Sequence, residues 1–111
     1  MQTFKFYDTM PTMECLQGDT LDTFRIYVND FGDLEGCTMQ LILEDKQLIG
    51  TAKKIKTCTA IDGGFEVRLT STDTSSLHGT YNLHFRMKDA SGLSHRKLAG
   101  ILIVRPAVQG E

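Results

Sequence analysis

The sequence predicts an all-β fold, an antiparallel β-sandwich of seven to eight short strands. One domain is expected over 1–106, with a frayed C-terminal tail at 107–111. Apolar and polar residues alternate with a period of two through most of the chain. Turn residues recur at roughly 8–12-residue spacing, which is typical of sandwiches and barrels. Helical periodicity is nearly absent, and a chain of 111 residues can bury a core without disulfides or metal.

Four strand patterns occupy the first half of the chain. The segment 3–7 alternates over a short length, and Pro11 separates it from a second pattern at 12–18. Longer alternations follow at 20–28 and 37–44. The apolar positions expected in the core, here and further along the chain, are Phe24, Ile26, Leu41, Val67, Leu69, Leu83 and Phe85.

The run 51–61 reads as an edge or half-exposed strand. Lys54 and Lys56 lie on one face of it, and lysines protect an exposed sheet edge from pairing with other chains. The glycine-rich segment 62–64 is a turn signal, and a further strand is expected at 65–70.

A short helical turn is expected at 70–77, because Ser and Thr residues there are suited to helix capping. A strand with alternating apolar residues then runs from Tyr81 to Met87. The loop 89–92 contains a glycine suited to a hairpin, and the returning strand, 93–106, ends at a proline.

Tyr81 stands where an immunoglobulin-like sandwich often has a tyrosine corner. In such domains a tyrosine near the start of the sixth strand folds back, and its hydroxyl bonds to the backbone a few residues upstream. The alternative is a core aromatic residue with no corner bond. Leu83 replaces the cysteine of antibody domains, and the chain has no tryptophan. The prediction is therefore an immunoglobulin-like domain that is not of the antibody type.

Composition disfavours several classes of partner. The net charge of −2 provides no attraction to nucleic acid or to an anionic membrane. The longest apolar run, 100–104, is far shorter than the roughly 20 residues of a membrane-spanning helix. No apolar signal region follows Met1, so we expect synthesis in the cytoplasm. The widely spaced cysteines, which are expected to be reduced thiols, are Cys15, Cys37 and Cys58.

No residue pattern indicates a catalytic or metal site. His84 and His95 could meet across a hairpin beside Asp89 and hold a metal, but solvent-facing histidines are the simpler reading. The acidic segment 29–36 is wrongly spaced for a calcium loop. The remaining acidic residues fall mostly in turns, where Asp bonds to the local backbone. We therefore expect a protein that is not an enzyme and has no cofactor, metal or small-molecule substrate.

The last strand is apolar on both faces. Its two alternating sets are Leu98, Leu102 and Val104, and Ala99, Ile101 and Ile103. Only one set can enter the core, so the other needs a cover, either from the strand at 3–7 or from another protein. The residues of this possible interface are Leu98, Ile101, Leu102 and Val104. A homo-oligomer is one expected arrangement, and a contact with a neighbouring protein is the other.

Four stretches carry a resemblance to a known family: QGDTLDTFRIYVND (17–30), DLEGCTMQLILED (33–45), DGGFEVRLTSTDTSSLHGTYNLHFRMKDASG (62–92) and LAGILIVRP (98–106). Together they resemble the immunoglobulin-like N-terminal domain of baseplate upper proteins of bacteriophages and prophages. The shared features are a GDT entry, a Thr-x-x-Asp-Thr-x-x-Leu corner before Tyr81, and a closing strand that ends in proline.

The resemblance implies a non-enzymatic structural or docking module of a phage or prophage particle, with the virion as its final location. Its partners would be further copies or other virion proteins. The chain lacks the long C-terminal portion with which such proteins bind a host receptor, so docking or assembly is the expected role. The alternative is a ligand-binding sandwich such as a carbohydrate-binding module. Such a module needs exposed aromatic rings to stack on sugars, and the scarcity of outward aromatic residues favours the first reading.

Overall fold

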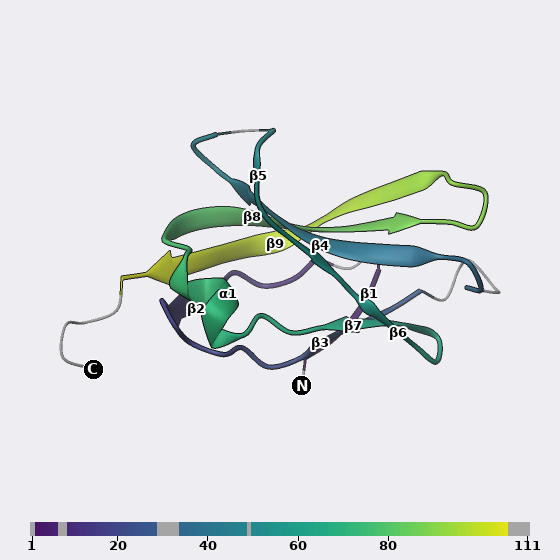
Figure 1. The fold of residues 1–111 in the computed structure, drawn as a ribbon, viewed down its shortest axis with the longest axis horizontal. Coiled ribbons are helices and arrows are strands. Elements are labelled where there is room, and N and C mark those ends of the chain that lie inside the picture. The colour runs from purple at the N-terminus through teal and green to yellow at the C-terminus, as the bar shows by residue number, and fades with distance from the viewer. Residues whose placement is uncertain (1, 7–8, 29–33, 49, 107–111) are drawn as a thin grey trace.

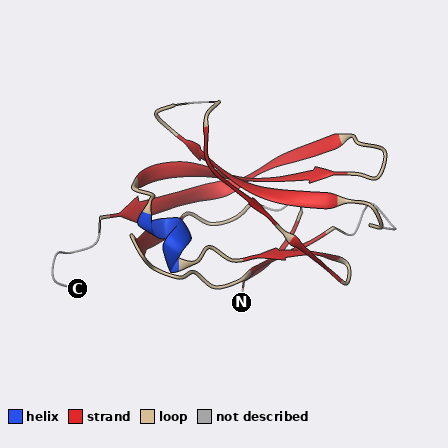
Figure 2. Cartoon of the chain, viewed as in Figure 1, coloured by secondary structure: helices blue, strands red, loops and turns tan. Residues whose placement is uncertain are grey.

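The computed structural model describes residues 2–6, 9–28, 34–48 and 50–106, with the backbone alone given for Gln2 and for 96–99. Figure 1 shows two sheets packed together with one short helix at an end, and Figure 2 shows how little of the chain is helical. The all-β prediction is therefore confirmed. The predicted tail at 107–111 lies outside the described residues.

Within the described residues, nine strands form the two sheets. The four-stranded sheet has the order β1 (Gln2–Lys5), β3 (Phe24–Tyr27), β7 (Gly64–Val67), β6 (Thr59–Ile61). The five-stranded sheet has the order β2 (Met13–Leu16), β9 (Ser94–Arg105), β8 (Gly79–Lys88), β4 (Thr38–Asp45), β5 (Ala52–Thr57).

The prediction of seven to eight antiparallel strands was wrong in two respects. The described residues form nine strands, and both sheets are mixed, because β1 runs parallel to β3 and β2 runs parallel to β9. Residue alternation records which face a side chain takes, and it is the same in parallel and antiparallel strands. The direction of pairing therefore could not be predicted from that pattern.

The ninth strand arises where the chain changes sheets. The run 51–61, expected as one edge strand, is β5 in one sheet and β6 in the other, separated by Cys58 alone. The amide of Cys58 donates to the carbonyl of Met39, 2.8 Å away, so β4 still holds the chain at the crossing point. In Figure 1 the two strands lie end to end along one side of the molecule, from the turn after β4 to the β6–β7 hairpin.

The core lies between the two sheets and contains every residue predicted for it. Phe24, Leu41, Leu69 and Leu83 are fully buried, and the other three predicted residues are 1–6% exposed. The rings of Phe24 and Phe85 meet edge to face across the sheets, with centroids 6.3 Å apart. Alternation in strands thus identified the core correctly, because successive side chains point to opposite faces of a sheet.

Gly64 lets the β6–β7 hairpin approach β3 closely. A Cβ at this position would lie 2.1 Å from the carbonyl oxygen of Ile26, a distance that no side chain tolerates. Gly63, at the tip of the hairpin, has a φ of +80° and provides the left-handed residue of the turn. The predicted turn signal at 62–64 is therefore explained by two different requirements on the backbone.

The helix α1 (Ser71–Ser75) begins with a capping box, as its Ser- and Thr-rich sequence predicted. The Thr70 hydroxyl accepts from the Asp73 amide, and the Asp73 carboxylate accepts from the Thr70 amide at 2.8 Å. No helix in the described part of the chain has the length and apolar character needed to cross a membrane.

Asp73 also binds the two lysines of β5 that were expected on one face of an edge or half-exposed strand. Lys54 lies 3.2 Å from Asp73, and Lys56 binds the second oxygen of the same carboxylate. Their partners across the sheet are Leu43 and Leu41, so they point toward the core side and reach over its open edge. Ile55, between the two lysines, points the other way and is an exposed apolar side chain, 54% accessible to solvent. Inward-pointing charges of this kind protect a sheet edge.

Candidate functional site: the outer face of the five-stranded sheet

Tyr81 begins the inward-facing set of β8, and its hydroxyl bonds to the backbone three residues upstream. The hydroxyl accepts from the amide of His78 at 2.8 Å and donates to the carbonyl of the same residue at 2.9 Å. The ring is 2% exposed. One side chain therefore satisfies both backbone groups of a residue that precedes the strand, while its ring fills the core.

The pairing of β8 with β9 decides which face of the last strand is internal. Tyr81 lies opposite Leu102, and both side chains point into the core. Leu102 and Val104, on the same face of β9, are 0% and 1% exposed. Ile101 and Ile103 point the other way and keep part of their surface exposed. The expectation that Leu102 and Val104 belong to an interface was therefore wrong.

The side chain of Leu98 lies outside the described residues, although its backbone pairs with His84. The register between β8 and β9 shifts at Leu83, which lies opposite Gly100. A strict alternation through the whole of β9 thus does not hold. The shift separates Leu98 from Leu102 and Val104, with which the sequence prediction grouped it.

The strand at 3–7 does not cover Ile101, because β1 belongs to the other sheet. The neighbour of β9 is β2, which extends the same sheet sideways. Met10, in the connection between β1 and β2, packs against Gly100, where a Cβ would lie 3.0 Å from the Met10 Cβ. The described part of this connection borders the outer face beside Ile101, which stays partly exposed.

We use the term outer face for the side of the five-stranded sheet that points away from the core. Its apolar residues are Ile42, Ile55, Ile101 and Ile103, and its main polar residues are Glu44, Asn82, His84 and Arg86. The two kinds of residue are interspersed across β4, β5, β8 and β9, so this face is neither a plain apolar surface nor a plain solvated one.

Glu44 is the centre of a polar cluster on the outer face. Its carboxylate accepts from the Gly50 amide at 2.8 Å and the Asn82 amide group at 3.1 Å, and it lies 3.2 Å from Nε2 of His84. These bonds, that of Gly50 foremost, lower the pKa of Glu44 to about 2. The ionised carboxylate accepts a hydrogen from Nε2 of His84, and Nδ1 of the same ring is buried without a hydrogen-bond partner among the described residues.

Two hollows flank this cluster. The larger, here called the Lys46 hollow, has a volume of about 600 Å³. Its lining includes Thr9, Met10, Thr12, Lys46, Asn82 and Ile101. The smaller, here called the Arg86 hollow, has a volume of about 140 Å³ and lies between β4, β5 and β8. The Lys46 hollow combines Met10 and Ile101 with one basic side chain, whereas the lining of the Arg86 hollow also includes Glu44 and His84.

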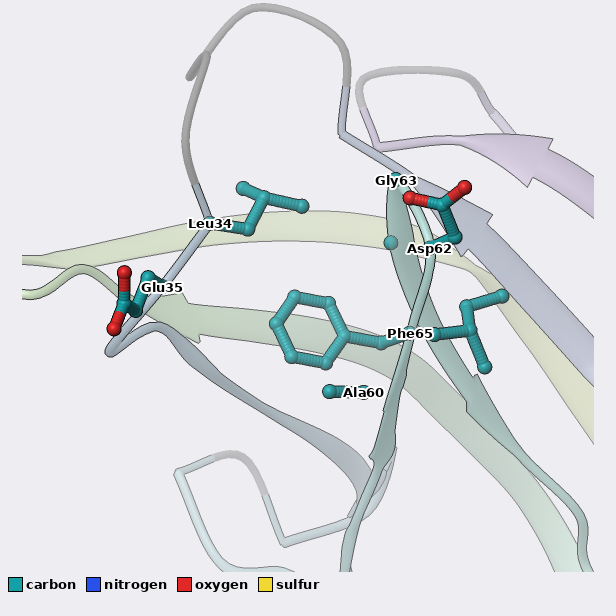
Figure 3. Close-up of a pocket in the computed structure, with 8 residues that line it drawn as sticks. Leu34, Glu35, Ala60, Asp62, Gly63 and Phe65 are labelled. Carbon is teal, nitrogen blue, oxygen red and sulfur yellow. The ribbon is translucent and has the colours of Figure 1, made fainter.

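A third hollow lies at the far end of the four-stranded sheet. Figure 3 shows it between the Leu34–Glu35 turn and the β6–β7 hairpin, with the Phe65 ring pointing across it and Asp62 at the tip of the hairpin. Its volume is about 370 Å³. Phe65 is 2% exposed, so its ring is buried and offers no platform for a sugar.

The structure separates the two histidines that could have formed a metal site. His84 binds Glu44, whereas His95 lies opposite Met87 and binds Asp89 at 3.0 Å. No three histidine, cysteine or acidic side chains are placed to hold a metal ion within the described ranges. Residues 29–33, most of the rejected calcium loop, lie outside the described residues.

The three cysteines are free thiols, two of them buried. Burial raises the pKa of Cys58 to about 12, and burial together with the charge of Asp19 raises the pKa of Cys15. A thiol with a raised pKa is a poor nucleophile. Cys15 and Cys58 thus have the chemistry of core residues rather than of catalytic ones.

Sequence reasoning missed the Glu44–Asn82–His84 cluster and the two hollows beside it. Glu44 and His84 are 40 positions apart, and they meet because β4 and β8 pair with Ile42 opposite His84. Only the polar alternation of Asn82, His84 and Arg86 signalled an outward face on β8, and it named no partner. A comparison with known protein families and with curated proteins found no match for this chain.

Proposed function

We propose that this chain is a non-enzymatic, immunoglobulin-like docking module of a phage or prophage particle. It acts through protein–protein contacts made by the outer face around Ile101. The proposal combines the sequence resemblance to domains of baseplate upper proteins with the chemistry of this face.

The order of the strands supports the immunoglobulin-like part of the proposal. Immunoglobulin domains place strands A, B, E and D in one sheet and C, F and G in the other. With β1 as A, β3 as B, β6 as D and β7 as E, the four-stranded sheet has the order A-B-E-D. With β4 as C, β8 as F and β9 as G, the other sheet contains G-F-C at its centre. The parallel pairing of β1 with β3 departs from that scheme.

The corner at Tyr81 supports the same part. It lies at the start of the strand that corresponds to F, and its hydroxyl bonds to the backbone of His78. This is the position and the bond of a tyrosine corner.

The observation that carries the docking function is the pair Ile101 and Ile103 on the outer face. Both lie on the side of β9 that faces away from the core, and neither the first strand nor the rest of the described chain covers them fully. Ile55 adds a side chain that is 54% exposed on the same side of the sheet. Apolar residues gathered on one face and mixed with polar ones are typical of a protein–protein interface.

The experiment is incorporation into particles. A host that carries the gene is induced, particles are purified by density gradient, and the chain is measured by mass spectrometry. The wild type is expected in the particle fraction at a fixed ratio to the other structural proteins. Ile101→Glu, shown to be folded by circular dichroism, is expected to be lost from particles, because a charge on the outer face opposes burial against a partner.

Leu93→Glu is the matched control. Leu93 is 64% exposed and lies in the β8–β9 loop, away from the outer face, so this variant is expected in particles at the wild-type level. Absence of the wild-type chain from particles would contradict the phage role. Normal incorporation of folded Ile101→Glu would contradict the use of the outer face.

A further inference from the structure

Nearly all acidic side chains of the described residues have a hydrogen-bond or ion-pair partner, but one does not. Almost every carboxylate in the described ranges accepts a hydrogen bond or forms an ion pair, including the acidic residues of turns, such as Asp45, which accepts from the Gln47 amide at 2.9 Å. Asp62 is the exception among the described residues. It is exposed at the tip of the β6–β7 hairpin, and no donor in the described part of the chain binds it.

Turn chemistry therefore does not explain an aspartate at position 62. Aspartate is favoured in turns because its carboxylate bonds to nearby backbone amides, and that bond is missing here. Gly63 beside it has no side chain, so the tip that carries the carboxylate is narrow (Figure 3).

On the outer face, basic side chains rather than carboxylates lack a partner. The carboxylate of Glu44 is fully used within the chain, and that of Glu14 binds Arg105 at 3.1 Å. Lys46 and Arg86, which line one hollow each, form no side-chain hydrogen bond or ion pair among the described residues. Among the described residues, this face therefore offers unpaired positive charge and no carboxylate without a partner.

The unpaired lysine and the unpaired aspartate lie beyond opposite ends of the run formed by β5 and β6. Lys46 follows β4 at the start of the turn into β5, and Asp62 follows β6. Figure 1 shows β5 and then β6 between them, running from the turn at the top to the hairpin at the lower right. Ten residues, 52–61, at a rise of about 3.3 Å each, separate the two ends by about 30 Å. They cannot pair within one molecule.

We propose that copies of this chain associate head to tail, with the Asp62 hairpin of one copy in the Lys46 hollow of the next. The carboxylate of Asp62 pairs with the Lys46 ammonium, and the walls formed by Met10 and Ile101 contact the rest of the tip. The inference rests on the proposed docking function and identifies a second copy as one partner of the outer face.

Size selects the Lys46 hollow over the Arg86 hollow. The Lys46 hollow, at about 600 Å³, has room for a two-residue turn with its side chain, whereas the Arg86 hollow, at about 140 Å³, holds little more than one side chain. A contact between different surfaces of identical copies does not close on itself at the dimer. It generates rings or open filaments.

The experiment is sedimentation velocity of the full chain from micromolar to millimolar concentration. The average mass of the wild type is expected to rise beyond that of a dimer. Lys46→Glu and Asp62→Lys are each expected to weaken association at least about fivefold, the factor that corresponds to one exposed ion pair of about 1 kcal/mol. The double variant with both changes is expected to associate as the wild type does, because the pair is restored with its charges exchanged.

Lys53→Glu and Arg86→Glu are the controls, since each makes the same charge change without altering the proposed contact. A wild type that stays monomeric throughout the range would overturn the inference, and so would a mass that saturates at the dimer or a double variant that fails to recover. Greater weakening by Arg86→Glu than by Lys46→Glu would assign the contact to the wrong hollow and also overturn it. None of these results depends on incorporation into particles, so the docking function is tested separately.

Discussion

Replacing Asp73 with asparagine removes the negative charge that joins the edge strand β5 to the start of α1. Asparagine has nearly the same shape, and its side-chain oxygen can still accept from the Thr70 amide, now 2.8 Å from the carboxylate. The capping geometry is therefore retained, and the main loss is the attraction to Lys54 and Lys56.

The size of the loss follows from the exposure of the three groups. The Asp73 side chain is 11% exposed, and each lysine side chain is 30% exposed. Exposed ion pairs contribute about 0–1 kcal/mol, whereas removing one partner of a buried pair costs about 3–5 kcal/mol. This cluster lies between those limits, so Asp73→Asn is expected to lower the free energy of unfolding by about 2 kcal/mol at pH 7. The corresponding fall in Tm is about 8 °C for a domain of this size.

The same substitution has a pH signature. Burial alone would raise the pKa of Asp73, but hydrogen bonds from Lys56, Thr70 and Lys54 outweigh it and hold that pKa far below its usual range. A carboxyl with a lowered folded-state pKa stabilises the fold above its unfolded pKa, about 3.9, and this contribution disappears as the pH falls through the folded-state value. The difference between wild type and Asp73→Asn should thus be constant above about pH 5 and shrink below about pH 4.

The assay is urea denaturation followed by far-ultraviolet circular dichroism, at dilutions where the protein is monomeric. Asp62→Asn makes the same chemical change at an exposed carboxylate without a partner, and it should shift stability by less than about 0.5 kcal/mol. If Asp73→Asn matches this control at pH 7, the two lysines contribute nothing to the fold. The ion pairs of Asp73 with Lys54 and Lys56 would then not be what holds β5 at the edge of the sheet.

The other expectations concern the corner, the last strand, a thiol and the outer-face carboxylate. Tyr81→Phe should cost about 1 kcal/mol in urea denaturation, the net value of a hydrogen bond, and a neutral effect would show that the corner bond is not stabilising. Leu102→Glu should abolish the folded circular dichroism spectrum while Ile101→Glu keeps it, and the reverse result would contradict the register of β9. Cys58 should resist a thiol reagent until urea unfolds the chain, when all three cysteines react. An NMR titration should give the Glu44 carboxyl a pKa of about 2. A midpoint above about 4 would show that the hydrogen bonds to Glu44 do not form in solution.

The core was predictable because it depends on alternation alone. Phe24, Leu41 and Leu83 are buried wherever their strands pair, as long as one face of each strand is turned inward. The run 51–61 shows the limit of that reasoning. Alternation places Lys54 and Ile55 on opposite faces but does not say which face points to the core. The lysines of this edge strand point to the core side because Asp73 forms ion pairs with them there.

The candidate site was only half predictable for a related reason. Two apolar faces on the last strand were visible in the sequence, but the choice between Ile101 and Leu102 required the pairing with Tyr81. The cluster of Glu44 with His84 required the register between β4 and β8, which no local pattern records. Long-range register is a property of the packed sheets. The sequence therefore indicated the apolar residues of the last strand but not the cluster of Glu44 with His84.

The strand that changes sheets at Cys58 also determines how the molecule would carry a mechanical load. A polypeptide extends at most about 3.3–3.6 Å per residue, and a β-strand is already close to that limit. Traction applied between Ala52 and Ile61 would therefore act along a backbone that is already almost fully extended. The hydrogen-bonded ladders on either side would be spared most of the shear. In a chain of copies joined at Lys46 and Asp62, the run 52–61 of each domain would be a nearly inextensible segment, and the contacts between copies would be the first to yield.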